Sequence, residues 1–226
     1  MLEYILKLAG KRKVRLGSSI LKFAACFVDY ESEHLPPTSR IVEHSYVFGK
    51  LMNMKVGKAL DIGCIARHNY ISPTLAFNGW DVYGVDIRSE WQFHHPNFHF
   101  IQGDVREVPL KFDSFDVVTC VSTIEHIGLA GYYGNRKETG MGDFQTMQKI
   151  RRILKPGGTL MLTVPYQYVY FQKPGARIYD MKRLTQMLAG FKIVDKVIYL
   201  QDKKGHWDVV DDTDVEGVIC LEAQKL

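Results

Sequence analysis

Short runs of β-branched and other apolar residues alternate with helix-like stretches from about residue 56 to the C-terminal end. Seven runs have the length and composition of β-strands: 58–62, 81–87, 98–102, 116–121, 159–164, 192–200 and 215–223. Strands that alternate with helices are typical of a parallel sheet with helices packed on both faces. The pattern therefore predicts an α/β fold built on a mostly parallel, seven-stranded sheet.

Helices are expected between most of these strands. One segment carries an apolar stripe along one helix face, at Phe144, Met147, Ile150, Ile153 and Leu154. Pro156-Gly157-Gly158 follows, and we expect it to end this helix and lead the chain into the strand at 159–164. A second helix is expected at 181–188, with Gly190 ending it in the same way.

The N-terminal segment differs in charge from the rest of the chain. Residues 1–28 contain six lysine or arginine residues against one acid, whereas the whole chain has a net charge of +4, so the remainder is close to neutral. We expect residues 1–55 to form a basic, helical extension that includes a helix at 40–54 capped by Ser39, and residues 56–226 to form the main domain. A solvated helix explains the basic segment most simply; contact with an anionic membrane surface or with nucleic acid is the alternative.

Composition also limits the class of protein. No stretch approaches the roughly 18 uninterrupted apolar residues of a membrane span, and no apolar block of a secretory signal is present at the start. The sequence therefore predicts a soluble, cytoplasmic protein.

The four cysteines lack C-x-x-C spacing, which favours reduced, buried thiols: Cys26, Cys64, Cys120 and Cys220. His94, His95 and His99 lie close together, but no acid stands at ligand spacing, and we expect no metal site.

Acidic residues stand at the carboxyl ends of the first three predicted strands. Asp61 is followed by Gly63, Asp86 comes 23 residues after that glycine, and Asp104 follows the end of the third strand. Open α/β sheets bind nucleotide-like ligands at this edge, and an acid about 20 residues after the glycine is placed to accept hydrogen bonds from a ribose diol. Asp104 would accept a bond from an adenine amine. The spacing therefore predicts a nucleoside site.

The order of the motifs is more specific than any one of them. Asp-x-Gly-Cys, Gly-x-Asp, Gly-Asp-Val, Phe-Asp-x-Val, Glu-His and Leu-Lys-Pro-Gly-Gly together resemble the class I S-adenosylmethionine-dependent methyltransferases of small molecules, over about residues 58–165. The resemblance implies a Rossmann-like sheet that closes with a C-terminal antiparallel hairpin, and S-adenosylmethionine as cofactor. It implies these donor-binding residues: Asp61, Gly63, Cys64, Asp86, Ile87, Asp104, Val105 and Ser122.

One loop departs from the family pattern. The family continues with Gly-x-Gly after the cysteine, whereas this chain has Ile65-Ala66-Arg67-His68-Asn69. Without those glycines the loop adopts positive φ less easily. We expect donor binding to be retained, because Asp61, Gly63, Asp86 and Asp104 remain for the polar groups of the donor.

Transfer of a methyl group to a hydroxyl needs a base that removes the hydroxyl proton. His126, just after the fourth strand, is the predicted general base, because an imidazole titrates near neutral pH. Glu125 would orient it or bind an acceptor hydroxyl; the alternative is that both residues only cap the following turn. The predicted acceptor contacts are aromatic or basic: Tyr132, Tyr133, Tyr166 and Arg67. Arg177 is a further candidate for binding an acidic group.

The acceptor expected from these residues is a sugar, a glycan precursor or another small molecule. The segment 122–129 is similar to methyltransferases encoded among surface-polysaccharide functions. Two alternatives stay open: an RNA methyltransferase, which the basic N-terminus favours, and an inactive binding protein, which the altered loop favours. Ser122-Thr123-Ile124-Glu125 replaces the Asn/Asp-Pro-Pro-aromatic turn of enzymes that flip a base, so nucleic acid is the less favoured acceptor.

Overall fold

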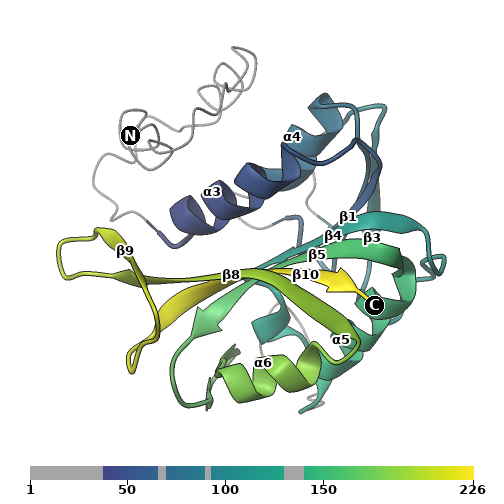
Figure 1. Ribbon diagram of the computed structural model, residues 1–226. Helices are drawn as coiled ribbons and strands as arrows, with labels where there is room; N and C mark the ends of the chain where they lie inside the picture. The colour runs from purple at the N-terminus through teal and green to yellow at the C-terminus, as the bar shows by residue number, and fades with distance from the viewer. Residues whose placement is uncertain (1–37, 66–69, 90–92, 130–139) are drawn as a thin grey trace. The chain divides into compact units, whose positions relative to one another are not determined.

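A computed structural model describes residues 38–65, 70–89, 93–129 and 140–226. Its main sheet has eight strands: β1 (Lys58–Ile62), β2 (Asp81–Asp86), β3 (Phe98–Gln102), β4 (Phe115–Val121), β5 (Leu154–Tyr166), β8 (Phe191–Gln201), β9 (Trp207–Val210) and β10 (Gly217–Lys225). Their spatial order is β3-β2-β1-β4-β5-β10-β8-β9 (Figure 1). Strands β1 to β5 are parallel, whereas β10 is antiparallel to both β5 and β8. The predicted α/β class, the seven predicted strands and the C-terminal antiparallel pair are confirmed.

Helices cover both faces of the sheet, as Figure 1 shows. Helices α3 (Arg40–Leu51) and α4 (Ile71–Phe77) lie on one face, and α5 (Gly142–Ile153) and α6 (Met181–Met187) lie on the other. Each face therefore has its own hydrophobic core. A short 3₁₀ helix, η1 (Ile124–His126), follows β4, and a separate hairpin is formed by β6 (Phe171–Lys173) and β7 (Ala176–Ile178).

The pleat of β1 assigns its side chains to these two cores. Leu60 and Ile62 are buried in the core shared with α5 and α6, whereas Ala59 is buried in the core shared with α3 and α4. Alternate residues of a strand point to opposite faces, so Asp61 faces the α3 and α4 side. Its carboxylate accepts a hydrogen bond from Ser72 of α4.

Helix α3 belongs to the main domain. The compact unit begins at Ser39 rather than at residue 56, because Tyr46, Val47 and Leu51 of α3 are buried in the core against β1 and α4. The helix ends at Leu51, earlier than the predicted residue 54. Ser39 occupies the N-cap position, but its side chain makes no capping bond. Its backbone is already helical instead of extended, and its carbonyl accepts the bonds from Val42 and Glu43.

The junction between α5 and β5 also differs from the prediction. Helix α5 ends at Ile153 and β5 begins at the next residue, so Pro156-Gly157-Gly158 lies inside the strand and does not end the helix. The register of β5 with β4 shifts between Leu154 and Thr159, which marks a bulge. Gly157 has a φ of +73° in this bulge, a conformation that favours glycine.

Two further observations concern membrane-spanning helices and the cysteines. None of the helices in the described part of the chain is long and apolar enough to span a membrane. Cys64, Cys120 and Cys220 are free thiols in the interior, whereas Cys26 lies outside the described residues, as do residues 1–28 with their basic charge.

Candidate functional site

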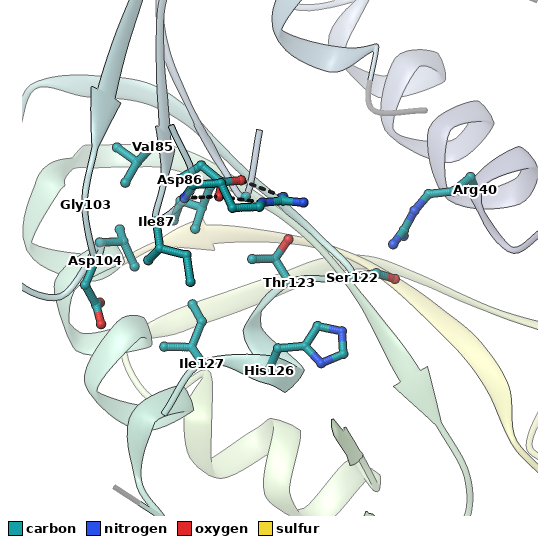
Figure 2. A pocket seen from close by; sticks show the side chains of 14 residues that line it. Arg40, Val85, Asp86, Ile87, Gly103, Asp104, Ser122, Thr123, His126 and Ile127 are labelled. Atoms are coloured by element: carbon teal, nitrogen blue, oxygen red, sulfur yellow. Dashed lines mark hydrogen bonds and ion pairs between the residues drawn. The ribbon is translucent and has the colours of Figure 1, made fainter. Parts of the chain in front are cut away.

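A pocket opens where the carboxyl ends of β1, β2, β3 and β4 meet (Figure 2). Residues from six elements or their adjoining loops line it: Arg40, Ile62, Gly63, Val85, Asp86, Ile87, Arg88, Gly103, Asp104, Val105, Ser122, Thr123, His126 and Ile127. Six of the eight residues predicted to bind the donor are among them. Its position matches the edge at which open α/β sheets bind ligands.

Asp86 ends β2 and is 4% exposed. Its Oδ2 accepts hydrogen bonds from the backbone N–H of Ile65 at 2.9 Å and from Nη2 of Arg88 at 2.9 Å. Its Oδ1 accepts from the backbone N–H and from Nε of Arg88, both at 3.0 Å. The carboxylate that was predicted to bind a ribose is therefore engaged by Arg88, an interaction that the motif did not reveal.

Asp104 has the same kind of partner two residues later. Arg106 donates from its backbone N–H to Oδ1 at 2.9 Å and from Nη2 to Oδ2 at 2.5 Å. Burial alone would raise the pKa of Asp104, but the hydrogen bonds and positive charge of Arg106 outweigh it and hold the pKa below its ordinary value. Asp104 is therefore ionised at neutral pH and accepts hydrogen bonds only.

Asp61 and Cys64 were predicted to bind the donor, but they do not line this pocket. Asp61 is fully buried, with Oδ2 accepting from the hydroxyl of Ser72 at 2.7 Å and Oδ1 from the hydroxyl of Thr119 at 2.8 Å. These two hydrogen bonds connect β1 to α4 and to β4. Cys64 is 1% exposed, and burial raises the pKa of its thiol far above the ordinary value, so it stays a neutral thiol.

Gly63 supplies the close backbone approach that the motif predicts. Its φ is +79°, and a Cβ at this position would collide with the side chain of Thr123. The backbone at the end of β1 is therefore packed directly against the segment that follows β4. Only glycine leaves this part of the pocket wall in place.

Arg40 is a pocket residue that sequence reasoning missed. It begins α3, and Figure 2 shows its side chain directed toward the pocket from the side opposite Asp104. Its Nη1 donates to Oε2 of Glu43 at 2.5 Å. A guanidinium has five N–H donors, so donors remain for a ligand. No motif links a helix at residue 40 to strand ends after residue 60; the contact exists only in the folded chain.

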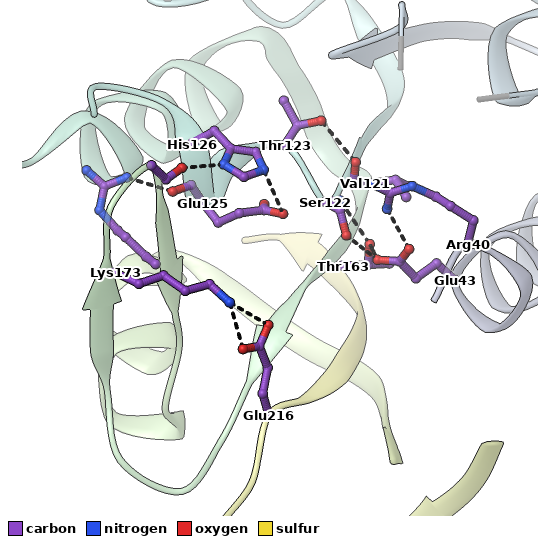
Figure 3. Close-up of polar contacts among 12 residues, drawn as sticks. Arg40, Glu43, Val121, Ser122, Thr123, Glu125, His126, Thr163, Lys173 and Glu216 are labelled. Atoms are coloured by element: carbon purple, nitrogen blue, oxygen red, sulfur yellow. Dashed lines mark hydrogen bonds and ion pairs between the residues drawn. The ribbon is translucent and has the colours of Figure 1, made fainter. Parts of the chain in front are cut away.

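His126 lies in η1 at the edge of the pocket, and Figure 3 shows contacts of its ring with Gly175 and Glu125. Nδ1 is 2.6 Å from the carbonyl oxygen of Gly175, so Nδ1 carries the proton and donates it. Nε2, which is 3.6 Å from Oε1 of Glu125, is then the nitrogen that can accept a proton. Burial lowers the pKa of His126, and the positive charges of Arg40, Arg177 and Lys173 lower it further against the opposing effect of the Gly175 bond. The imidazole is therefore neutral at neutral pH.

Glu125 lies behind His126 and does not line the pocket. Its side chain is 2% exposed, and Oε2 has no hydrogen-bond partner. Burial raises the pKa of Glu125 to about 8, so at neutral pH the carboxyl group is mostly protonated. Glu125 and His126 therefore form a pair in which the proton resides on the acid and the imidazole is available as a base.

The predicted acceptor residues are only partly described. Tyr166 is buried in the core, where its hydroxyl donates to Asp212 at 2.9 Å, and it does not line the pocket. Arg67, Tyr132 and Tyr133 lie outside the described residues. Arg177 is fully buried and does not line the pocket, but it donates to the carbonyl of the pocket residue Ile127 at 2.9 Å.

Comparisons with known proteins agree with this architecture. The family described as Caenorhabditis protein of unknown function, DUF268, matches residues 103–213. A ubiquinone biosynthesis O-methyltransferase from Rickettsia akari (strain Hartford) is 27% identical over 187 residues, which cover 74% of this chain and 71% of that protein.

Solved structures share the fold at low sequence identity. A SAM-dependent methyltransferase from Methanosarcina mazei has a TM-score of 0.55 and 20% identity, over 85% of this chain and 99% of its own. The 1,6-didemethyltoxoflavin-N1-methyltransferase of Burkholderia thailandensis, solved with 1,6-didemethyltoxoflavin and S-adenosylhomocysteine, has a TM-score of 0.56 and 14% identity, over 95% of this chain and 93% of its own. These likenesses support the resemblance seen in the sequence, and the chain shares the fold of the S-adenosylmethionine-dependent methyltransferases.

Proposed function

We propose that the chain binds S-adenosylmethionine in the strand-end pocket and methylates a hydroxyl group of a small molecule. The observation that carries the proposal is the convergence of Gly63, Asp86, Asp104 and His126 on one pocket. Asp86 and Asp104 would accept hydrogen bonds from the ribose and the adenine amine, and Ile87 and Val105 supply apolar contacts for the base. The tight backbone of Gly63 fits a ligand that lies against the end of β1.

Arg40 extends this assignment to the amino-acid end of the donor. It is a pocket guanidinium on the side away from Asp104, and a guanidinium suits a carboxylate. The loop at 65–69 lacks the family's later glycines, and Arg40 offers a charged contact that compensates for them. Donor retention despite the altered loop therefore has a physical basis.

His126 would serve as the general base. S-adenosylmethionine supplies an electrophilic methyl group when it is bound. The bound donor would supply this methyl group to the acceptor oxygen while the broken bond leaves its electron pair on the donor sulfur, and Nε2 of His126 would accept the hydroxyl proton. Nδ1 is fixed on Gly175, which presents Nε2 as the acceptor, and the lowered pKa keeps it unprotonated.

The relative from Rickettsia akari favours an oxygen acceptor over nitrogen, since that protein is named as an O-methyltransferase. A sugar or glycan precursor remains our proposed acceptor class, together with other small hydroxylated molecules, and we propose a cytoplasmic location. We do not favour RNA, because the chain lacks the base-flipping turn after β4.

Calorimetry and a transfer assay test the proposal in two steps. Calorimetry with S-adenosylhomocysteine should give saturable binding with one site per chain; no binding at millimolar ligand would contradict the donor assignment. A donor with a labelled methyl group is then offered to glycan precursors, small phenols and RNA. Label in RNA alone would contradict the small-molecule proposal, and label on nitrogen would contradict the hydroxyl acceptor.

A further inference from the structure

Glu43 is a buried acid of helix α3 that connects three elements at the pocket (Figure 3). Its side chain is 0% exposed. Oε2 accepts from Arg40, whereas Oε1 accepts from the hydroxyl of Ser122 and, at 2.8 Å, from the hydroxyl of Thr163. A carboxylate this deep inside a protein is tolerated only where its oxygens are satisfied, and here they are satisfied entirely by polar groups at or next to the pocket.

Two of the groups that Glu43 holds are pocket residues. Arg40 and Ser122 both line the pocket, while Thr163 lies on β5 behind Ser122. Ser122 has a φ of +38°, which an L-residue rarely adopts. Its backbone N–H donates to the carbonyl of Thr163 at 3.0 Å, and its hydroxyl is held by Glu43. The unusual backbone at the end of β4 is therefore fixed from the side of α3.

We propose that Glu43 is a positioning residue for the amino-acid end of the donor. It holds the guanidinium of Arg40 toward the pocket and keeps Ser122 in its left-handed conformation, so that both residues are in place before the ligand arrives. The inference rests on the proposed function, because it takes Arg40 as the partner of the donor carboxylate. It predicts a defect confined to one end of the ligand.

The test compares two ligands that differ only at that end. S-adenosylhomocysteine carries the amino-acid group, and 5′-methylthioadenosine keeps the adenosine and sulfur but lacks it. In Glu43→Gln the amide replaces one oxygen by a second donor next to Arg40 and removes the ion pair, while the remaining oxygen still accepts from Ser122 or Thr163. We expect calorimetry to show about tenfold or greater loss of affinity for S-adenosylhomocysteine, with affinity for 5′-methylthioadenosine within about twofold of wild type.

Asp195→Asn is the matched control. Asp195 of β8 pairs with Lys50 of α3, the helix that carries Glu43, at 2.7 Å. It also accepts a hydrogen bond from Tyr46 of α3 at 3.3 Å, and it lies outside the pocket. The substitution therefore removes an ion pair that attaches α3 to the sheet without changing the pocket lining. We expect some loss of thermal stability and unchanged affinity for both ligands.

The outcomes separate this inference from the proposed function. If wild type binds neither ligand, the proposed function fails. If wild type binds both, and Glu43→Gln leaves both affinities unchanged or weakens both equally, Glu43 is not a positioning residue. Should Glu43→Gln not fold, Arg40→Gln removes the same ion pair from its more exposed partner, whose side chain is 23% exposed. An unchanged ratio of the two affinities in that variant would overturn the inference.

Discussion

Arg88 donates three hydrogen bonds to Asp86, from its backbone N–H, Nε and Nη2, at 2.9 to 3.0 Å. With the bond from Ile65, the carboxylate accepts four in all, which is about the capacity of its two oxygens. A ribose diol can therefore bind Asp86 only if the guanidinium of Arg88 gives up its bonds. In the free protein, Arg88 therefore occupies the carboxylate that the ribose of the donor would bind.

Removing the Arg88 side chain should strengthen donor binding. We expect Arg88→Ala to raise the affinity for S-adenosylhomocysteine by about 1–2 kcal/mol, which is roughly 5- to 30-fold, because the ribose no longer displaces charged hydrogen bonds. Titration calorimetry measures the change. Arg152→Ala, on the exposed side of α5, is the control and should bind like wild type. Equal or weaker binding by Arg88→Ala would show that Arg88 supports the site.

Removing the acid should have the opposite effect. We expect Asp86→Ala to weaken donor binding by ~1–3 kcal/mol, the range for leaving buried donors without an acceptor. The same titration checks it, and a melting curve verifies that the variant is folded, since Asp86 also accepts from the backbone of Ile65. Unchanged affinity would remove the ribose from this carboxylate.

His126→Ala separates chemistry from binding. We expect turnover to fall by about 100-fold or more, in line with the loss of a general base, while affinity for S-adenosylhomocysteine stays the same. Steady-state rates with an identified acceptor, together with calorimetry, make the comparison. Turnover at the wild-type level would exclude His126 from proton removal.

The pH dependence of turnover follows from the lowered pKa of His126. A base acts when it is unprotonated, so the rate should rise with pH through a midpoint below the ordinary histidine value of about 6.5. Lys173 contributes one of the charges that lower this pKa, and its exposed side chain pairs with Glu216. Lys173→Gln should move the midpoint upward. A midpoint above 6.5 in wild type would contradict the electrostatic assignment.

Glu125 should make folding stability depend on pH. Its pKa is raised to about 8 in the folded protein, so between its ordinary range and about pH 8 the folded state binds more protons than the unfolded state. Stability from this group is therefore full at low pH and is lost as pH rises toward 8, by up to about 1.4 kcal/mol per pH unit. Denaturant unfolding of wild type and Glu125→Gln between pH 5 and 8 isolates this contribution. Parallel curves would show that Glu125 is ionised in the folded protein.

The fold could be predicted from the sequence because local pattern and tertiary environment agree. Strands such as β4 are apolar on both faces, as the central strands of a covered parallel sheet must be. Strand β9 was missed because Trp207–Val210 is only four residues long and lies at the sheet edge, so its apolar residues are too few to predict a strand. Its existence depends on pairing with β8.

The sequence could predict only those pocket residues whose position follows from where a strand ends. Asp86, Asp104 and His126 reach one pocket because parallel strands end at one edge. Asp61 shares the motif but is turned by the pleat toward Ser72, so it does not line the pocket. Arg40 reaches the pocket through the packing of α3 on the sheet, and Arg88 reaches Asp86 through a side-chain conformation; neither follows from spacing along the chain.

The pocket draws Arg40 from the helical layer on one face of the sheet and His126 from the other face. A molecule that contacts both residues would connect these two helical layers at the edge of the sheet. Because it would bind the folded chain alone, its effect on the melting temperature grows with its concentration relative to its dissociation constant. Thermal shift can therefore rank candidate acceptors, in the presence of S-adenosylhomocysteine, before any turnover is measurable.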